Sequence, residues 1–414
     1  MSNINNVLKK GIPFLLAINA CILLIPNKWK AISILTLGLV VLTYYFKNRS
    51  SRFNYRFLLT NGILFLIFIV SCSYSENINY ALKKIETTSS LIIFPIIFSL
   101  LLSSNFILTK KVLERILLSF CISVVIFLLV SFAYFWNQEF TFIETIIHYS
   151  NLIDIRLGLF SIHPIYLSIY IGISLLFSIQ LFDNNKKLKV LCLFMAILYL
   201  LFLAILGRRG PVISMLLIGF IYFMFRFNFY KVLLSIFSLA LFAIIMISIP
   251  KYQNHNRFKD LYDGTIAKDS SSSLYLRYNI YKCGIESIKE RPLIGYGLGD
   301  VQKQLNDCYR SNDMVFPKKI YNSHNQFIGL ILISGFIGLL LYLYTLYLNI
   351  KKSLELKSFL TSSLILYFIF NFFTENILER EHGVILYSFF TCLLLYAIEK
   401  NNRQTDLYDS EAIS

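Results

Sequence analysis

The sequence predicts an all-α, polytopic membrane protein with about twelve transmembrane helices. Of its 414 residues, 57% are hydrophobic and only 15% are charged, which is more apolar and less charged than a soluble globular chain. Runs of about 16 to 26 mostly uncharged residues also recur along the whole chain, and a helix needs about 20 residues to cross the hydrocarbon core. Because no soluble domain of ordinary size is left over, we expect residues 1–414 to form a single membrane domain.

Twelve apolar segments are the expected membrane helices: 11–25, 31–46, 57–73, 90–107, 115–135, 164–182, 189–206, 211–226, 231–249, 325–350, 358–373 and 383–398. The first segment follows Lys9 and Lys10, as the apolar part of a secretory signal does. It nevertheless continues to Ile25-Pro26 without a small-residue cleavage pattern. We therefore expect a membrane helix here and not a cleaved signal.

The basic residues predict how these helices are oriented, since Lys and Arg accumulate in cytoplasmic connections. With a cytoplasmic N-terminus, the inner connections hold nineteen Lys and Arg residues, and the five short outer connections hold eight. This bias places both termini in the cytoplasm. The remaining basic residues lie in one long outer loop, 250–324, whose length largely exempts it from the rule.

The net charge of +16 is better explained by membrane topology and contact with anionic lipid headgroups than by nucleic-acid binding. The predicted helices also carry almost no ionisable residue at mid-depth. Pumps and carriers usually place charged or broken-helix sites there. The composition thus disfavours a flippase or exporter.

Cysteine placement leaves one question open. Five of the seven cysteines lie in apolar segments, whereas Cys283 and Cys308 share the long outer loop. In an oxidising compartment these two could form a disulfide, and two free thiols are the alternative.

Two arginines lie in a connection of about four residues, Gly207-Arg-Arg-Gly210, against the orientation bias. Pro211 suits the first turn of the following helix, whose N-terminal amides favour anions. Arginine binds phosphate oxygens bidentately. Arg208 and Arg209 are therefore candidate ligands of a diphosphate at the outer surface, with simple contact to lipid headgroups as the alternative.

The outer loop contains a predicted amphipathic helix over 273–291, stopped by Pro292. Its expected apolar stripe comprises Leu274, Tyr281, Ile285 and Ile288, and Arg277 falls inside that stripe. We expect Arg277 to be a second anion ligand or a structurally paired cation. The segment Gly295-Tyr-Gly-Leu-Gly-Asp300 follows, and because no strand precedes it we interpret it as a turn and not as a phosphate loop.

Histidines provide the candidate base, and in this topology all five lie on the outer side: His148, His163, His255, His324 and His382. His324 stands where the chain re-enters the membrane, with Ser323 or Asn325 able to cap the helix. A pKa near working pH makes it a candidate general base, with a capping role as the alternative.

Two further residues are predicted to support this site. Glu375 follows the segment 358–373 and could orient a histidine or pair with an arginine. His163, which precedes Pro164 at a helix start, is expected to be mainly structural.

Taken together, these motifs resemble those of the O-antigen ligase and polymerase family of bacterial inner-membrane glycosyltransferases. The resemblance spans about 205–340 and is carried by Gly207-Arg-Arg-Gly210, by Arg277 and then Arg291-Pro-Leu-Ile-Gly-Tyr-Gly-Leu-Gly299, and by Ser323-His-Asn325 leading into Leu332-Ile-Ser-Gly-Phe-Ile-Gly338. Thr374-Glu-Asn376 and His163-Pro164 also look like members from Bacteroidetes-type bacteria. The family arginine maps onto Arg209, and Arg208 stands where a small polar residue is usual.

This resemblance implies a GT-C-like fold and a metal-independent, cofactor-free, inverting transferase facing the periplasm. The implied donor is a glycan on undecaprenyl diphosphate, held by Arg209 and Arg277, and His324 would deprotonate or orient the acceptor hydroxyl. A ligase that uses a lipid A core sugar as acceptor is the expected activity. A polymerase that extends lipid-linked repeats is the alternative, followed by a protein O-oligosaccharyltransferase.

Overall fold

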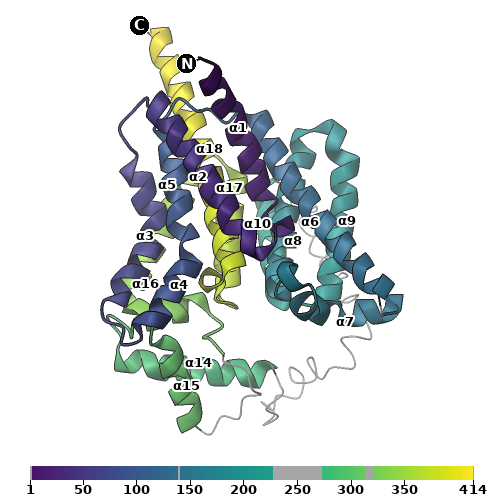
Figure 1. Ribbon diagram of the computed structural model, residues 1–414, viewed down its shortest axis with the longest axis vertical. Helices are drawn as coiled ribbons and strands as arrows, with labels where there is room; N and C mark the ends of the chain where they lie inside the picture. Colours follow the sequence, from purple (N-terminus) through teal and green to yellow (C-terminus); the bar gives the residue numbers. More distant parts are fainter. Residues whose placement is uncertain (1, 139, 227–272, 313–320, 414) are drawn as a thin grey trace.

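The computed structural model describes residues 2–138, 140–226, 273–312 and 321–413. Within these ranges the chain is a bundle of α-helices without a β-strand (Figure 1). Every apolar segment predicted in these ranges overlaps a helix. The helices are α1 (Ser2–Ala20), α2 (Lys30–Asn48), α3 (Tyr55–Cys72), α5 (Ser90–Leu102), α6 (Lys110–Gln138), α8 (Pro164–Asn184), α9 (Lys189–Leu206), α10 (Arg209–Arg226), α16 (Gln326–Glu355), α17 (Phe359–Phe372) and α18 (Glu381–Ile413). The all-α prediction is thereby confirmed for the described residues. The segment 231–249 and His255 lie outside them.

Eight stretches in the described ranges are long and apolar enough to cross a membrane. They contain α2, α3, α5, α6, α8, α9, α16 and α18, while α10 and α17 are shorter apolar helices. Two predicted ends are wrong, because α1 ends at Ala20 and not near residue 25, and α5 ends at Leu102 and not near residue 107. The protein is thus a multi-pass membrane protein, and the count of twelve and the orientation stay predictions.

Four shorter helices lie outside the predicted apolar segments: α4 (Ile78–Thr88), α7 (Phe142–Ile155), α14 (Ser273–Glu290) and α15 (Val301–Ser311). In Figure 1, α14 and α15 lie at the end of the bundle opposite the start of α1 and the end of α18. Helix α14 packs against both α15 and α16. The outer-loop helix predicted over 273–291 is therefore present, and it covers the bundle end at which α16 begins.

The glycine-rich segment after α14 joins this cover to the bundle. Tyr296 and Gly297 donate backbone hydrogen bonds to Leu332 and Ile333 of α16, at 2.7 and 2.9 Å. These bonds lie where α16 is interrupted at Gly335, whose φ of 65° and ψ of −172° are not helical. An added Cβ at Gly335 would lie 1.9 Å from the Leu293 carbonyl oxygen. The turn interpretation is confirmed, and the glycines allow two backbones to approach closely.

The buried face of α14 matches the predicted stripe in part, because Tyr281 and Ile288 pack against buried residues. Ile280 and Cys283 are buried, whereas Ile285 is half exposed. Gly284 comes so close to α16 that an added Cβ would lie 2.9 Å from the Ile328 side chain. Small residues on this face, next to the buried Ile280, let the two helices approach, so close packing helps to decide which face of α14 turns inward.

Candidate functional site

The start of α16 is built by a short run of polar residues. The Asn325 side chain accepts hydrogen bonds from the amides of Phe327 and Ile328, at 2.9 and 3.1 Å, and so caps the helix. The preceding His324 has a φ of +43°, a conformation that few side chains adopt. Its amide donates to the Asn322 carboxamide oxygen at 3.1 Å, which supports this turn. Because Asn325 does the capping, the imidazole of His324 is left to contact other groups.

Glu375, just beyond α17, contacts both His324, the candidate base, and Arg277, the candidate anion ligand. One of its carboxylate oxygens lies 3.1 Å from His324 Nδ1, and the other lies 3.4 Å from Arg277 Nη2. The exposed fractions of the side chains are 13% for Glu375, 26% for His324 and 36% for Arg277. A carboxylate can only accept hydrogen bonds. We therefore assign the proton to Nδ1, which leaves Nε2 of a neutral His324 able to accept a proton.

We call Arg277, His324 and Glu375 the His324 site. The pairing that the sequence left open for Arg277 is present, and its partner is Glu375. A paired guanidinium still has further N–H groups, because it carries five donors in all. The site therefore combines a proton acceptor with a cation at its edge.

Several contacts fix the loop after α17 against the start of α16. The Asn325 carboxamide donates to the Phe373 carbonyl at 3.2 Å. Ser323 and Asn376, both buried, lie within 3.1 Å of one another through their side chains. The Tyr281 hydroxyl lies 3.3 Å from the His324 carbonyl oxygen. These contacts hold the loop that carries Glu375 close to His324.

The Gly207-Arg-Arg-Gly210 motif reaches the same loop. Gly207 ends α9 with a left-handed φ of 64°, and Arg209 is exposed at the first residue of α10. A Cβ added to Gly210 would lie 2.6 Å from Thr374 Oγ1. Glycine at position 210 thus lets the N-terminus of α10 pack directly against the residue that precedes Glu375.

The other arginine of the motif points toward α7. Arg208 Nη2 donates to Ser150 Oγ at 3.0 Å. Its charge also acts on His163, whose pKa is lowered to about 4, first by burial and then by Arg208. His163 begins α8, where its Nδ1 accepts from the Ile165 amide at 3.4 Å. This capping bond agrees with the structural interpretation, because a largely buried imidazole next to a guanidinium stays neutral.

The structure therefore brings most predicted site residues to one end of the bundle. His324, Arg277 and Glu375 are in contact, Asn325 is adjacent in sequence, and Arg209 precedes the glycine that packs beside Thr374. His163 lies close enough for Glu375 and Arg208 to affect its pKa. Their roles in binding and catalysis stay predictions.

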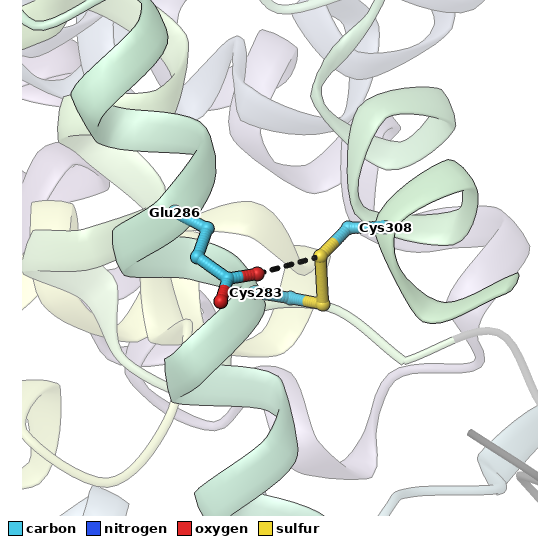
Figure 2. A group of neighbouring side chains, drawn as sticks. All are labelled: Cys283, Glu286 and Cys308. Carbon is cyan, nitrogen blue, oxygen red and sulfur yellow. Dashed lines mark hydrogen bonds between the residues drawn. A yellow bond between two sulfur atoms is a disulfide. The ribbon is translucent and has the colours of Figure 1, made fainter. Parts of the chain in front are cut away.

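The question about the two loop cysteines has an answer in the structure. Cys283 of α14 and Cys308 of α15 form a disulfide, shown in Figure 2. A Glu286 carboxylate oxygen lies 3.6 Å from Cys308 Sγ. These three residues are close enough to resemble a metal-binding group. The sulfurs bonded to each other are no longer thiolate ligands, so this cluster is a structural link between two helices.

Sequence reasoning missed the network beneath His324. Asn376 donates to Glu379 Oε1 at 2.6 Å, and Glu379 lies 3.9 Å from the Lys84 ammonium of α4. Asn322 was also missed, although an asparagine two residues before a left-handed residue is a recognisable turn signal. The Lys84 contact has no such signal, because it joins positions almost 300 residues apart.

Comparison with known families agrees with the resemblance seen in the motifs. The family model described as O-antigen ligase matches residues 194–343, a range that contains the arginine motif, Arg277 and His324. No curated protein matches the sequence significantly. The match supports an activity of the O-antigen ligase or polymerase type in general, acting on lipid-linked glycans in a membrane. This match supports the O-antigen ligase family for residues 194–343, the part of the chain that carries the arginine motif and His324.

Proposed function

We propose that the protein is a glycosyltransferase that moves a glycan from undecaprenyl diphosphate to a sugar of the lipid A core, at the periplasmic face of the inner membrane. The observation that carries the proposal is the double contact of Glu375, which joins a candidate base, His324, to a candidate phosphate ligand, Arg277. The packing of Gly210 against Thr374 supports a role for Arg209 at the same place.

In the proposed reaction, His324 Nε2 takes the proton of the acceptor hydroxyl as its oxygen attacks the anomeric carbon. The bond between that carbon and the phosphate oxygen breaks, and the diphosphate leaves with the electron pair. Arg209 and the free edge of Arg277 stabilise the charge that develops on it, and Arg208 supports them. Direct displacement inverts the anomeric configuration. Glu375 keeps the imidazole in the required tautomer and stabilises it when protonated.

A polymerase is the second candidate, because it uses the same donor chemistry and differs in the acceptor. The test is purified protein in liposomes with an undecaprenyl-diphosphate glycan, supplied with or without lipid A core. Product on lipid A core supports a ligase, whereas longer lipid-linked glycan in its absence supports a polymerase. Transfer to a protein acceptor would indicate a protein O-oligosaccharyltransferase. Movement of the glycan across the membrane without a new glycosidic bond would reject all three and indicate a flippase.

Matched variants test the site assignment in the same assay. We expect His324→Gln and Arg277→Gln to reduce transfer at least about 100-fold, within the range usual for a lost general base or a lost charge stabiliser. His148→Gln is the control for the histidine, because His148 is an exposed residue of α7. Arg310→Gln is the control for the arginine, because Arg310 is exposed on α15. Equal activity of a site variant and its control would reject the assignment.

A further inference from the structure

A polar cavity of about 440 Å³ lies at the opposite end of α16 from the His324 site. It is formed where α3 begins and α16 ends, beside α18; the residues that line it include Asn54, Arg56, Asn61, Lys351, Lys352 and Glu399. Along α16, the 23 residues from Gln326 to Leu348 correspond to about 33 Å. The cavity therefore lies near the other face of the membrane.

The charges around this cavity leave it cationic. Lys352 is paired with Glu399, which also accepts from the Asn54 carboxamide at 3.3 Å. Lys351 lies 3.9 Å from Glu355, one turn along α16, but both side chains are more than half exposed to solvent. Such an exposed pair contributes little and separates readily. Because Arg56 is exposed as well, the cavity has two cations that can reach an anion and amide groups beside them.

An exposed apolar surface continues from these two cations toward the middle of the membrane. On α16, Tyr344, Tyr347 and Lys351 are spaced by three and four residues and so lie along one face. On α3, Leu59 lies one turn after Arg56. Tyr344, Tyr347 and Leu59 are all exposed to the surroundings of the protein. In a membrane, this surface faces acyl chains, and tyrosines near its edge are typical of the headgroup boundary.

We propose that this cavity binds the headgroup of an anionic phospholipid from the leaflet opposite the His324 site. Arg56 and Lys351 would contact the phosphate, and the carboxamides of Asn54 and Asn61 would face the hydroxyl or ester groups of the headgroup. The acyl chains would lie along Leu59, Tyr344 and Tyr347. A free phosphate ion shares the cationic contacts but uses no part of the apolar surface, which favours a lipid. The proposal is independent of the glycosyl-transfer activity.

The experiment uses the full chain in nanodiscs of phosphatidylcholine, with phosphatidylglycerol added in increasing amounts. Binding is measured as retention of phosphatidylglycerol by native mass spectrometry and as the rise in unfolding temperature. The double variant Arg56→Gln/Lys351→Gln is expected to bind it about 30-fold more weakly, because each basic residue near the surface contributes about a factor of five. Lys47→Gln/Arg52→Gln is the matched control, since it removes the same charge from exposed positions near the same face but outside the cavity.

Selective loss of binding in the cavity variant supports the proposal. Equal loss in both double variants would overturn it, because binding would then depend on overall charge. A further arm adds inorganic phosphate to the unmutated protein in phosphatidylcholine alone. Stabilisation by inorganic phosphate equal to that by phosphatidylglycerol would also overturn the proposal, since the ligand would then be a soluble anion. This arm needs no variant and so does not depend on how the variants fold.

Discussion

Replacing Glu375 by glutamine tests the central contact of the proposed site. The two carboxylate oxygens accept from two different donors, His324 Nδ1 at 3.1 Å and Arg277 Nη2 at 3.4 Å. Glutamine has the same shape but only one acceptor oxygen, and its amide nitrogen is a donor. In Glu375→Gln, one of the two partners must therefore face an N–H group.

The size of the effect follows from the kind of bond that is lost. A hydrogen bond to a charged group contributes about 1.5–3 kcal/mol. The ion pair with Arg277 adds little, because that side chain is 36% exposed. If the lost energy is the stabilisation of protonated His324 in the transition state, kcat should fall about 10- to 150-fold.

The assay is glycan transfer in proteoliposomes, with kcat and KM for the lipid-linked donor measured separately. Loss of the His324 contact should lower kcat, whereas loss of the Arg277 contact alone should mainly raise KM. Glu355→Gln, at the far end of α16, provides a control with the same charge change on an exposed residue. Unchanged kcat and KM in Glu375→Gln, with normal amounts of folded protein, would refute the reasoning.

Three further predictions concern packing, pH and the disulfide. Gly210→Ala should lower the free energy of unfolding by about 1–3 kcal/mol and reduce transfer, because the new methyl group would lie 2.6 Å from a threonine oxygen. Gly219→Ala in the same helix is the control and should be tolerated, because an added Cβ there meets nothing within 4 Å. Thermal unfolding compares the two variants. The pKa of His163 is about 4 in the folded protein and about 6.5 unfolded, so the stability that the neutral imidazole contributes is complete above pH 6.5 and is lost as the pH falls toward 4. The unfolding temperature of His163→Gln should therefore vary less across this window than that of the unmutated protein. An identical pH dependence of the two proteins would contradict the assignment. Removing the Cys283 to Cys308 disulfide, which spans 25 residues, should destabilise the region around α14 and α15 by about 3 kcal/mol; hydrogen exchange of residues 273–312 measures this, and unchanged protection in the doubly serine-substituted protein would contradict it.

Much of the fold could be predicted because its signals are local. An apolar run of the right length is sufficient to predict a membrane helix, and each such run in the described ranges is helical. Asn325 could be identified as a potential cap from its position before an apolar run, and it caps α16. The gathering of His163, Arg208, Arg209 and His324 at one end of the bundle also followed from counting helices.

The sequence by itself determined the membrane class, the position of these helices and the residue types at one end of the bundle. Only the tertiary structure decided that Glu375 contacts both His324 and Arg277, that Cys283 bonds to Cys308, and that α14 turns its small residues and not Ile285 inward. The physical reason is the distance along the chain between the residues that determine each feature. Helix formation depends on neighbours a few residues apart, whereas a carboxylate's partners and a helix's buried face depend on how segments distant in sequence pack together.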